Sequence, residues 1–335
     1  MIISLDVMGG DTAPEVTVHG AVWAARDFDI EVQLVGNPEA IEAELTRHST
    51  DGLRLPIIPA SQVIEMTDSP VEAARRKKNA SMNVAVKQVK SGVSKAFVTA
   101  GNSGGALAAA LFGLGRIKGI KRPALSTIYP AASKHGFCFL LDVGANTEVK
   151  AEYLYQFGLM GSLYAEKALN IPNPRIGIVS TGEEEGKGSK LVVEAGALMK
   201  DAPFNFVGNI EGKDIPAGLA DVIVTDGFTG NVIVKVSEGL GAWIANMIKT
   251  EIKSRPMAMA GAILSRGALK AIEKKMDYRE FGGGALLGVN GVVIVTHGRS
   301  DAYTIRNALR VAKTAVENDI IAAIKAVSSK KKDEG

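Results

Sequence analysis

Polar side chains that could bind an anion gather in glycine-rich turns that follow short apolar runs of the chain. The first run, residues 1–7, leads into Met8-Gly9-Gly10-Asp11, a turn that matches neither of the common nucleotide-binding glycine motifs. Glycine lets the backbone approach a ligand closely, and a helix that begins after such a turn offers free N–H groups. The turns therefore predict a site for a small oxyanion, with the candidate residues Asp6, Gly9, Gly10, Asp11, Asn102, Ser103, Gly104, Asp142, Asn146, Glu183, Asp226, Thr229 and Gly230.

Two alternatives apply to these turns. Any single Gly-Asn-Ser turn also fits an ordinary helix cap, whereas several such turns in one chain favour a shared site. The aspartates could ligate Mg²⁺, or they could brace the loops by accepting backbone N–H bonds. We favour bracing because the sequence contains no D-x-D pair near these turns, and we expect no metal since no cluster of His and Cys is present.

The elements that must position these turns alternate along the chain. Short apolar runs rich in branched residues, without strict polar alternation, are typical of buried strands. Helices are predicted after Pro14, from about Asn102, over 150–169, from Thr229 and from Asp301. The alternation predicts a three-layer α/β/α fold with a mixed, largely parallel sheet. The expected strands are 1–7, 31–36, 53–60, 95–100, 137–143, 175–181, 204–210 and 221–227.

Composition limits the class of protein. The chain has 335 residues, of which 46% are hydrophobic, and no linker-like segment, so we expect one domain over 1–330 and a charged tail over 331–335. The net charge of +3 argues against a nucleic-acid partner. The single cysteine, Cys138, lies within an apolar run and is expected in the core. One cysteine and the absence of a secretory signal or a long apolar segment indicate a cytoplasmic protein.

Eight segments of the chain are distinctive in their order: DVMGGDTAP, AGNSGGALA, DVGAN, GEEEGKG, GNIEGKD, TDGFTGNV, LLGVNG and HGRSD. In these segments the chain resembles bacterial phosphate acyltransferases of phospholipid synthesis, over about residues 1–327. There are two departures from the family pattern: Ser180-Thr181 replaces Asn-Ile, and Gly284-Ala285 replaces Ala-Pro, so that the loop at Gly284 is expected to be looser.

The resemblance implies the activity and its surroundings. Orthophosphate would attack the thioester of a long-chain acyl-[acyl carrier protein], and a membrane-bound glycerol-3-phosphate acyltransferase would use the acyl phosphate. It also implies a homodimer with the fold of isocitrate and isopropylmalate dehydrogenases and of phosphotransacetylases, and no cofactor. Phosphate is itself a nucleophile, so the site needs only to position it and to stabilise the oxyanion. Asn231 is expected to contact phosphate or the oxyanion. Lys187 is expected to neutralise charge or to protonate the departing thiolate, with His297 as the alternative acid.

One segment does not fit a buried core. Pro256 interrupts a long helical stretch, and the eight residues 257–264 that follow are small or apolar, with basic residues on both sides. We expect a helical hairpin over about 230–278, whose tip meets the membrane surface or the acidic carrier protein. Packing at a dimer interface is the alternative. The expected contact residues are Met257, Met259, Ile263, Leu264, Arg255, Arg266, Lys270 and Lys274.

Three rival functions remain open. A phosphotransacetylase-type enzyme would use acyl-CoA with the same chemistry. A metal-dependent decarboxylating dehydrogenase would need an aspartate cluster and several arginines, which the polar turns lack. A non-catalytic membrane scaffold would have no need for the polar glycine turns. The resemblance favours the acyl carrier protein as donor and peripheral association with the inner face of the cell membrane.

Overall fold

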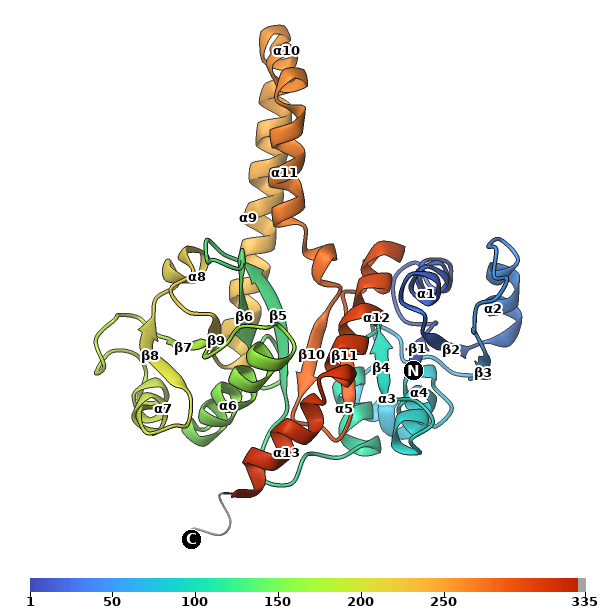
Figure 1. Ribbon diagram of the computed structural model, residues 1–335, viewed down its shortest axis with the longest axis horizontal. Helices are drawn as coiled ribbons and strands as arrows, with labels where there is room; N and C mark the ends of the chain where they lie inside the picture. The colour runs from blue at the N-terminus through green and yellow to red at the C-terminus, as the bar shows by residue number, and fades with distance from the viewer. Residues whose placement is uncertain (331–335) are drawn as a thin grey trace.

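A single twisted sheet forms the centre of the molecule (Figure 1). The computed structural model describes the backbone of residues 1–330, and all of their side chains except those of 273–276, 278, 329 and 330. The predicted tail, 331–335, lies outside the described residues. Across the sheet the strands follow the order β3 (Ile57–Pro59), β2 (Glu31–Gly36), β1 (Ile2–Asp6), β4 (Ala96–Thr99), β11 (Val292–Val295), β10 (Gly284–Leu287), β5 (Ala124–Pro130), β6 (Phe137–Leu141), β9 (Val222–Val224), β7 (Arg175–Val179) and β8 (Asn205–Ile210).

The sheet is mixed because β10 lies antiparallel between β11 and β5, and β5 in turn lies antiparallel to β6. The strands β1, β2, β3, β4 and β11 run one way, and β6, β7, β8 and β9 run the other way. All eight expected strands are present. The strands β5, β10 and β11 were not expected, since β5 is partly exposed and the four-residue strands β10 and β11 lie in a glycine-rich stretch.

Helices cover both faces of the sheet, as the three-layer prediction requires. One face is packed by α1 (Glu15–Phe28), α6 (Ala151–Lys167), α12 (Ala302–Glu317) and α13 (Ile320–Lys330) over one large apolar core. The other face carries two separate cores, one beneath α3–α5 and one beneath α8 and the start of α9. The remaining helices are α2 (Pro38–Leu45), α3 (Pro70–Arg76), α4 (Ser81–Lys90), α5 (Ser103–Gly113), α7 (Lys190–Lys200), α8 (Asp214–Ala217) and α9 (Gly227–Lys253).

Three local predictions have clear outcomes. The expected helix from Asp301 is broken at Asp319, whose φ of 50° ends α12 and starts α13. Cys138 is fully buried in β6, where burial raises its thiol pKa to about 12, so its role in the core is confirmed. The loop at Gly284 is not loose: Gly284 begins β10, and a Cβ there would stand 1.7 Å from the carbonyl oxygen of Ser126.

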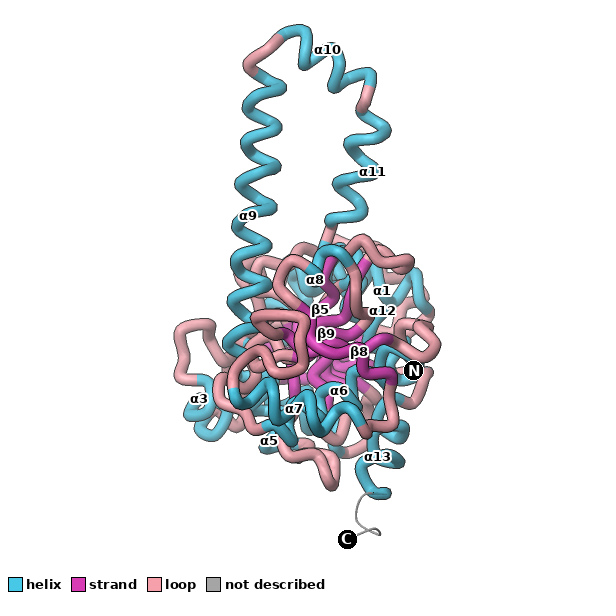
Figure 2. The backbone as a smooth tube through the Cα atoms, turned by 90° about the vertical axis from the view of Figure 1, so that its left-hand side faces the viewer, coloured by secondary structure: helices cyan, strands magenta, loops and turns pink. Residues whose placement is uncertain are grey.

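A helical hairpin projects from the sheet, as Figures 1 and 2 show. It consists of α9, the tip helix α10 (Pro256–Leu264) and α11 (Arg266–Met276), and it returns to the sheet through the short 3-10 helix η1 (Tyr278–Phe281). Pro256 occupies the first turn of α10, where proline costs no hydrogen bond. At about 1.5 Å per residue, the 27 residues of α9 span about 40 Å, so the tip lies far from the sheet.

Candidate active site

The candidate site lies between α5 and α9, on the face of the sheet where the two smaller cores are separated. A small cavity there is lined by Ser103 and Gly104 from α5 and by Gly144 and Ala145 from the loop after β6. Leu125, Leu286 and Val295 form its floor. Turns that are far apart in the sequence therefore meet at one place.

The register of the sheet explains how these turns meet even though their strands run in opposite directions. Val295, at the end of β11, pairs with Gly284 of β10. Two residues further along β10, Leu286 pairs with Leu125 of β5, whose N–H donates to the Asp142 carboxylate at 3.1 Å. The carboxyl ends of β11 and β6 are thus only a few residues apart in register. The strands β10 and β5 lie between them, and because each of the three neighbouring pairs is antiparallel, β11 and β6 run in opposite directions and end about two residues apart in register.

The N-terminus of α5 supplies backbone donors to this cavity. Asn102 caps the helix, because its Oδ1 accepts from Gly105 N at 3.0 Å. Its Nδ2 donates to the carbonyl oxygens of Glu65 and Met66 at 3.2 and 3.3 Å. The Asn102 side chain is therefore occupied in a structural role, contrary to the expectation that it contacts phosphate. The exposed Ser103 lines the cavity, and as the first residue of α5 its N–H has no acceptor within the helix.

Asp142 organises the second wall of the site. This buried carboxylate accepts backbone N–H bonds from Gly144, Ala145 and Asn146 at 2.8–3.2 Å. The Asn146 amide donates to Asp142 at 2.8 Å and to the Pro123 carbonyl at 2.7 Å. Burial raises the pKa of Asp142, although these donors oppose the shift. Both predicted residues therefore brace the loop, which fits the bracing interpretation of the aspartates.

The start of α9 packs against the Asp142 loop, next to the cavity. Asp226 caps the helix, accepting from Thr229 N at 2.9 Å and from Thr229 Oγ1 at 2.7 Å. Gly230 lies against the Asp142 carbonyl, where a Cβ would stand 1.9 Å from the oxygen. Asn231 is exposed on the next position of the helix and retains its side-chain amide for a ligand.

The Gly9-Gly10 turn packs behind this site against the loops after β4 and β11. A Cβ on Gly9 would stand 2.5 Å from Asp6 Oδ2 and 2.8 Å from Gly101 N. Asp6 is buried and accepts from Thr99 Oγ1 at 2.7 Å, and burial raises its pKa. Asp11 N donates to Gly298 O at 2.8 Å. The turn thus holds the β4 and β11 loops together rather than enclosing a nucleotide.

Charged residues from α9 and from the loop after β11 complete the site. Arg299 Nη2 lies 3.2 Å from Glu238 Oε2 of α9. His297 is open to solvent, yet partial burial of its ring and the positive charges of Arg299 and Lys235 lower its pKa. Asn231, Lys235 and Glu238 occur at helical spacing and therefore share one face of α9. Lys235 was not predicted, although this spacing relative to Asn231 could have identified it.

Lys187 and Glu183 do not line the small cavity. They lie in the loop after β7, which pairs with β9 and lies about 10 Å from β6 across the sheet. Lys187 N donates to Glu184 O at 2.9 Å, and Ser180 Oγ donates to Lys187 O at 3.1 Å. The sequence suggested one cleft for all the turns, but β7 is the neighbour of the edge strand β8, so this loop lies toward the outer side of the sheet (Figure 1).

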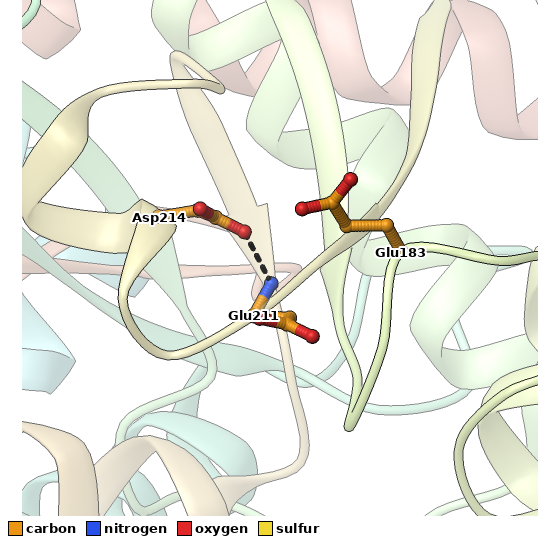
Figure 3. Close-up of side chains that lie close together, drawn as sticks. All are labelled: Glu183, Glu211 and Asp214. Carbon is orange, nitrogen blue, oxygen red and sulfur yellow. Dashed lines mark hydrogen bonds between the residues drawn. The ribbon is translucent and has the colours of Figure 1, made fainter.

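Glu183 instead lies near Glu211 and Asp214, as Figure 3 shows. The carboxylate oxygens of these three residues lie within 4.8 Å of one another. Lys213 Nζ lies 2.5 Å from Glu211 and 3.6 Å from Glu183, and Asp214 accepts from Glu211 N at 3.0 Å. The cluster is therefore partly neutralised by a lysine ammonium group.

A larger cavity, of about 380 Å³, lies on the opposite face of the sheet. Ser126 and Ile128 of β5 line it, whereas Leu125 faces the α5–α9 site. Successive side chains of a strand point to opposite faces, so the sheet separates the two cavities.

The hairpin tip is strongly exposed. Met257 and Leu264 are 87% and 89% exposed, and Ile263 is 70% exposed. Met259, Arg255, Arg266 and Lys270 are also exposed, whereas the Lys274 side chain lies outside the described residues. Within residues 1–330, no helix combines the length and the apolar composition needed to cross a membrane.

Comparison with known proteins identifies the family. A family model described as fatty acid synthesis protein matches residues 1–323. The chain belongs to this family. A phosphate acyltransferase of Heliobacterium modesticaldum is 51% identical over 325 residues, which cover 97% of this chain and 96% of that protein. A phosphate acyltransferase of Alkaliphilus oremlandii is 49% identical and covers 100% of this chain and 99% of its own length.

Family membership confirms the resemblance and shows that the chain is an enzyme. Solved structures confirm the fold. A phosphotransacetylase of Streptococcus pyogenes superposes with a TM-score of 0.61 at 17% identity, covering 98% of this chain and 94% of that chain. A 4-hydroxythreonine-4-phosphate dehydrogenase of Klebsiella pneumoniae superposes with a TM-score of 0.56 at 12% identity, covering 94% of this chain and 99% of that chain. The chain therefore has the same fold as a phosphotransacetylase and a 4-hydroxythreonine-4-phosphate dehydrogenase.

Proposed function

We propose that this enzyme transfers a long-chain acyl group from acyl-[acyl carrier protein] to orthophosphate, and that the acyl phosphate feeds phospholipid synthesis. The observation that carries the proposal is the cavity that the first turn of α5 lines together with Gly144 and Ala145 of the Asp142 loop, against which the start of α9 packs. A first helical turn has no intrahelical partners for its N–H groups and therefore favours an anion. The names of the relatives support phosphate as the acyl acceptor.

In this proposal each wall of the site has a task. The N–H groups of Ser103 and Gly104 and the Ser103 hydroxyl bind orthophosphate. Lys235 and Arg299 balance its charge, with Lys235 in the role expected earlier of Lys187. Asn231 donates to the oxygen of the thioester carbonyl when that oxygen becomes negative. Such a donor typically contributes 10²–10³ in kcat (about 3–4 kcal/mol).

The chemical step needs no protein nucleophile. An oxygen of hydrogen phosphate bonds to the thioester carbon, and the resulting tetrahedral oxyanion collapses with loss of the carbon–sulfur bond. The proton that hydrogen phosphate carried ends on the departing thiolate, so acyl phosphate and free thiol form without another reactant. Holding phosphate against the thioester converts a bimolecular reaction into a local one, which is worth several kcal/mol.

His297 is the proposed carrier of that proton. It lies in the same loop as Arg299, and its lowered pKa keeps it mostly neutral near pH 7. A neutral imidazole can accept the phosphate proton and then pass it to sulfur. Lys187 is not assigned this task because its loop lies outside the central strands.

The hairpin is assigned to assembly and to the membrane. Val232, Val236, Leu240, Trp243 and Met247 are exposed at helical spacing along α9, and a second copy of the chain would cover such a stripe. The apolar tip with its flanking cations suits the headgroup region of an anionic bilayer. We therefore propose a homodimer that associates peripherally with the inner face of the cell membrane and delivers acyl phosphate to a membrane-bound glycerol-3-phosphate acyltransferase.

Donor choice tests the proposal. The purified protein is incubated with labelled orthophosphate and either palmitoyl-[acyl carrier protein] or palmitoyl-CoA, and acyl phosphate is trapped with hydroxylamine. We expect kcat/KM to be at least tenfold higher with the carrier protein. Equal or better turnover of palmitoyl-CoA would favour a phosphotransacetylase-type enzyme. No product with either donor would refute acyl transfer to phosphate.

A further inference from the structure

A second group of cations lies close to the candidate site, on α3 and α4. It comprises Arg75, Arg76, Lys78 and Lys87, all exposed, and we call it the α3–α4 basic surface. Lys87 Nζ donates to the carbonyl of Lys78 at 3.2 Å, which joins α4 to the turn that follows α3, and Arg75 lies over the Phe112 ring at 4.9 Å.

Acidic residues neutralise only part of this surface. Arg76 pairs with Glu72 at 2.8 Å, and the neighbouring Lys77 pairs with Asp68 at 2.5 Å. Among the ion pairs of the described residues, Arg75, Lys78 and Lys87 have no carboxylate partner. The surface therefore keeps a net positive charge that the fold does not use.

The segment that carries these cations is attached directly to the candidate site. The Asn102 amide holds the loop before α3 through the carbonyls of Glu65 and Met66. Pro70, the first residue of α3, packs on Gly104, where a Cβ would stand 2.8 Å from the proline ring. Since α3 has seven residues, its cationic end lies about 10 Å beyond Pro70.

The basic residues of the hairpin are much farther from the site. Arg255 follows Asn231 by 24 residues of almost continuous helix, which corresponds to about 36 Å. Figure 2 shows α3, α5 and the base of α9 on the same side of the molecule, with α10 at the distant end. A partner that docks on the tip of the hairpin would therefore lie about 36 Å from the entrance of the site on the same chain.

We infer that the acidic acyl carrier protein docks on the α3–α4 basic surface, and that the hairpin tip is left to the membrane. This inference rests on the proposed function. The carrier must bring its thioester to Ser103 and Asn231, and the α3–α4 basic surface is the cationic surface joined to that entrance. Complementary charge at the rim of an interface speeds association and makes it sensitive to salt.

Matched double charge reversals test the inference. Lys78→Glu with Lys87→Glu alters the α3–α4 basic surface, and Lys249→Glu with Lys253→Glu makes the same charge change on the exposed distal half of α9. We measure the Kd of fluorescently labelled holo-carrier protein by anisotropy, and KM and kcat with palmitoyl-[acyl carrier protein]. An uncharged acyl-pantetheine thioester serves as the small donor.

We expect the α3–α4 variant to raise Kd and KM for the carrier at least tenfold at low salt, with kcat/KM for acyl-pantetheine within twofold of wild type. The hairpin variant should leave both carrier constants within twofold and weaken binding to anionic vesicles. Unchanged carrier binding in the α3–α4 variant, or a larger loss in the hairpin variant, would overturn the inference. If the wild-type enzyme makes acyl phosphate from acyl-pantetheine but does not bind the carrier protein, the inference is also overturned. That result would still support acyl transfer to phosphate. No acyl phosphate from either donor would refute the proposed function itself.

Discussion

Gly230 and Asp142 lie so close that a Cβ built on Gly230 would stand 1.9 Å from the backbone oxygen of Asp142. This contact joins the first turn of α9 to the loop that the Asp142 carboxylate braces. It therefore fixes the position of Asn231 relative to the wall that carries Gly144 and Ala145. The helix that forms the base of the hairpin is thus directly attached to the candidate site.

Gly230→Ala should displace α9 from the Asp142 loop. We expect a loss of about 1–3 kcal/mol in the free energy of unfolding, as for an overpacked contact, and a loss of acyl transfer. Chemical denaturation and product assays measure the two effects. Gly239→Ala is the control, since a Cβ there meets no atom within 4 Å and should stabilise α9 by about 1 kcal/mol. Equal changes in stability and activity in the two variants would contradict the close contact between Gly230 and Asp142.

Asn231→Ala should reduce kcat by about 10²–10³, because it removes a donor to the developing oxyanion, while leaving the free energy of unfolding nearly unchanged. Lys187→Ala should stay within threefold of wild type, since its loop lies outside the central strands. We compare kcat of the two variants by steady-state kinetics at saturating phosphate. An Asn231→Ala enzyme within threefold of wild type, or a larger defect in Lys187→Ala, would reject this assignment.

Lys235→Gln should raise KM for orthophosphate about tenfold with a smaller change in kcat, because a charge that binds phosphate acts before the chemical step. Lys249→Gln removes the same charge from the same helix, three to four turns farther from the site. It should leave KM for phosphate unchanged. A phosphate KM that responds equally to both substitutions would indicate a general charge effect instead.

The pH dependence of the rate should report His297. Its pKa is lowered, chiefly by partial burial and then by Arg299, so the protonated form accumulates only below its ordinary value of 6.5. As a proton acceptor in its neutral form, His297 should give a rate that rises with pH through this lowered pKa. Arg299→Gln should move the rise to higher pH, and His297→Gln should abolish it. A pH profile insensitive to both substitutions would exclude His297 from proton transfer.

Asp6 should make the protein less stable as pH rises. Its pKa in the folded state is raised by burial above the ordinary value of 3.8, so folding favours the protonated form. The stabilisation is complete below the unfolded pKa and is lost as pH increases through the folded pKa. Asp6→Asn should therefore gain stability relative to wild type as the pH rises above 3.8, as urea titrations would measure. If the difference in stability between Asp6→Asn and wild type does not change with pH, the pKa of Asp6 is not raised in the folded state.

Much of the fold could be predicted from local patterns. Buried strands such as β1 and β4 are short runs of branched residues, and Asn102 and Asp226 mark helix starts by their capping chemistry. The strands β10 and β11 were missed because Gly284 and its glycine neighbours look like a loop. Their place depends on a close backbone approach to Ser126, which is a tertiary contact.

The site was harder to predict than the fold. The sequence identified the glycine turns, but strand direction decides which of them meet, and local patterns carry no information on direction. The antiparallel pairings of β10 and β5 bring the β11 and β6 ends together, whereas the Lys187 loop follows β7, on the far side of β9. Asn102 and Thr229 have the side chains of anion ligands, yet both take part in helix caps in the folded chain.

The central claim is that orthophosphate attacks the thioester carbon directly at the α5–α9 site. The most direct measurement supplies phosphate labelled with four ¹⁸O atoms and palmitoyl-[acyl carrier protein], and analyses the acyl phosphate by mass spectrometry. The account predicts a product that retains all four labelled oxygens in wild type, with formation reduced about 10²–10³ in Asn231→Ala. Loss of one labelled oxygen, which would mean attack of a carboxylate on phosphorus, or no acyl phosphate at all, would contradict it.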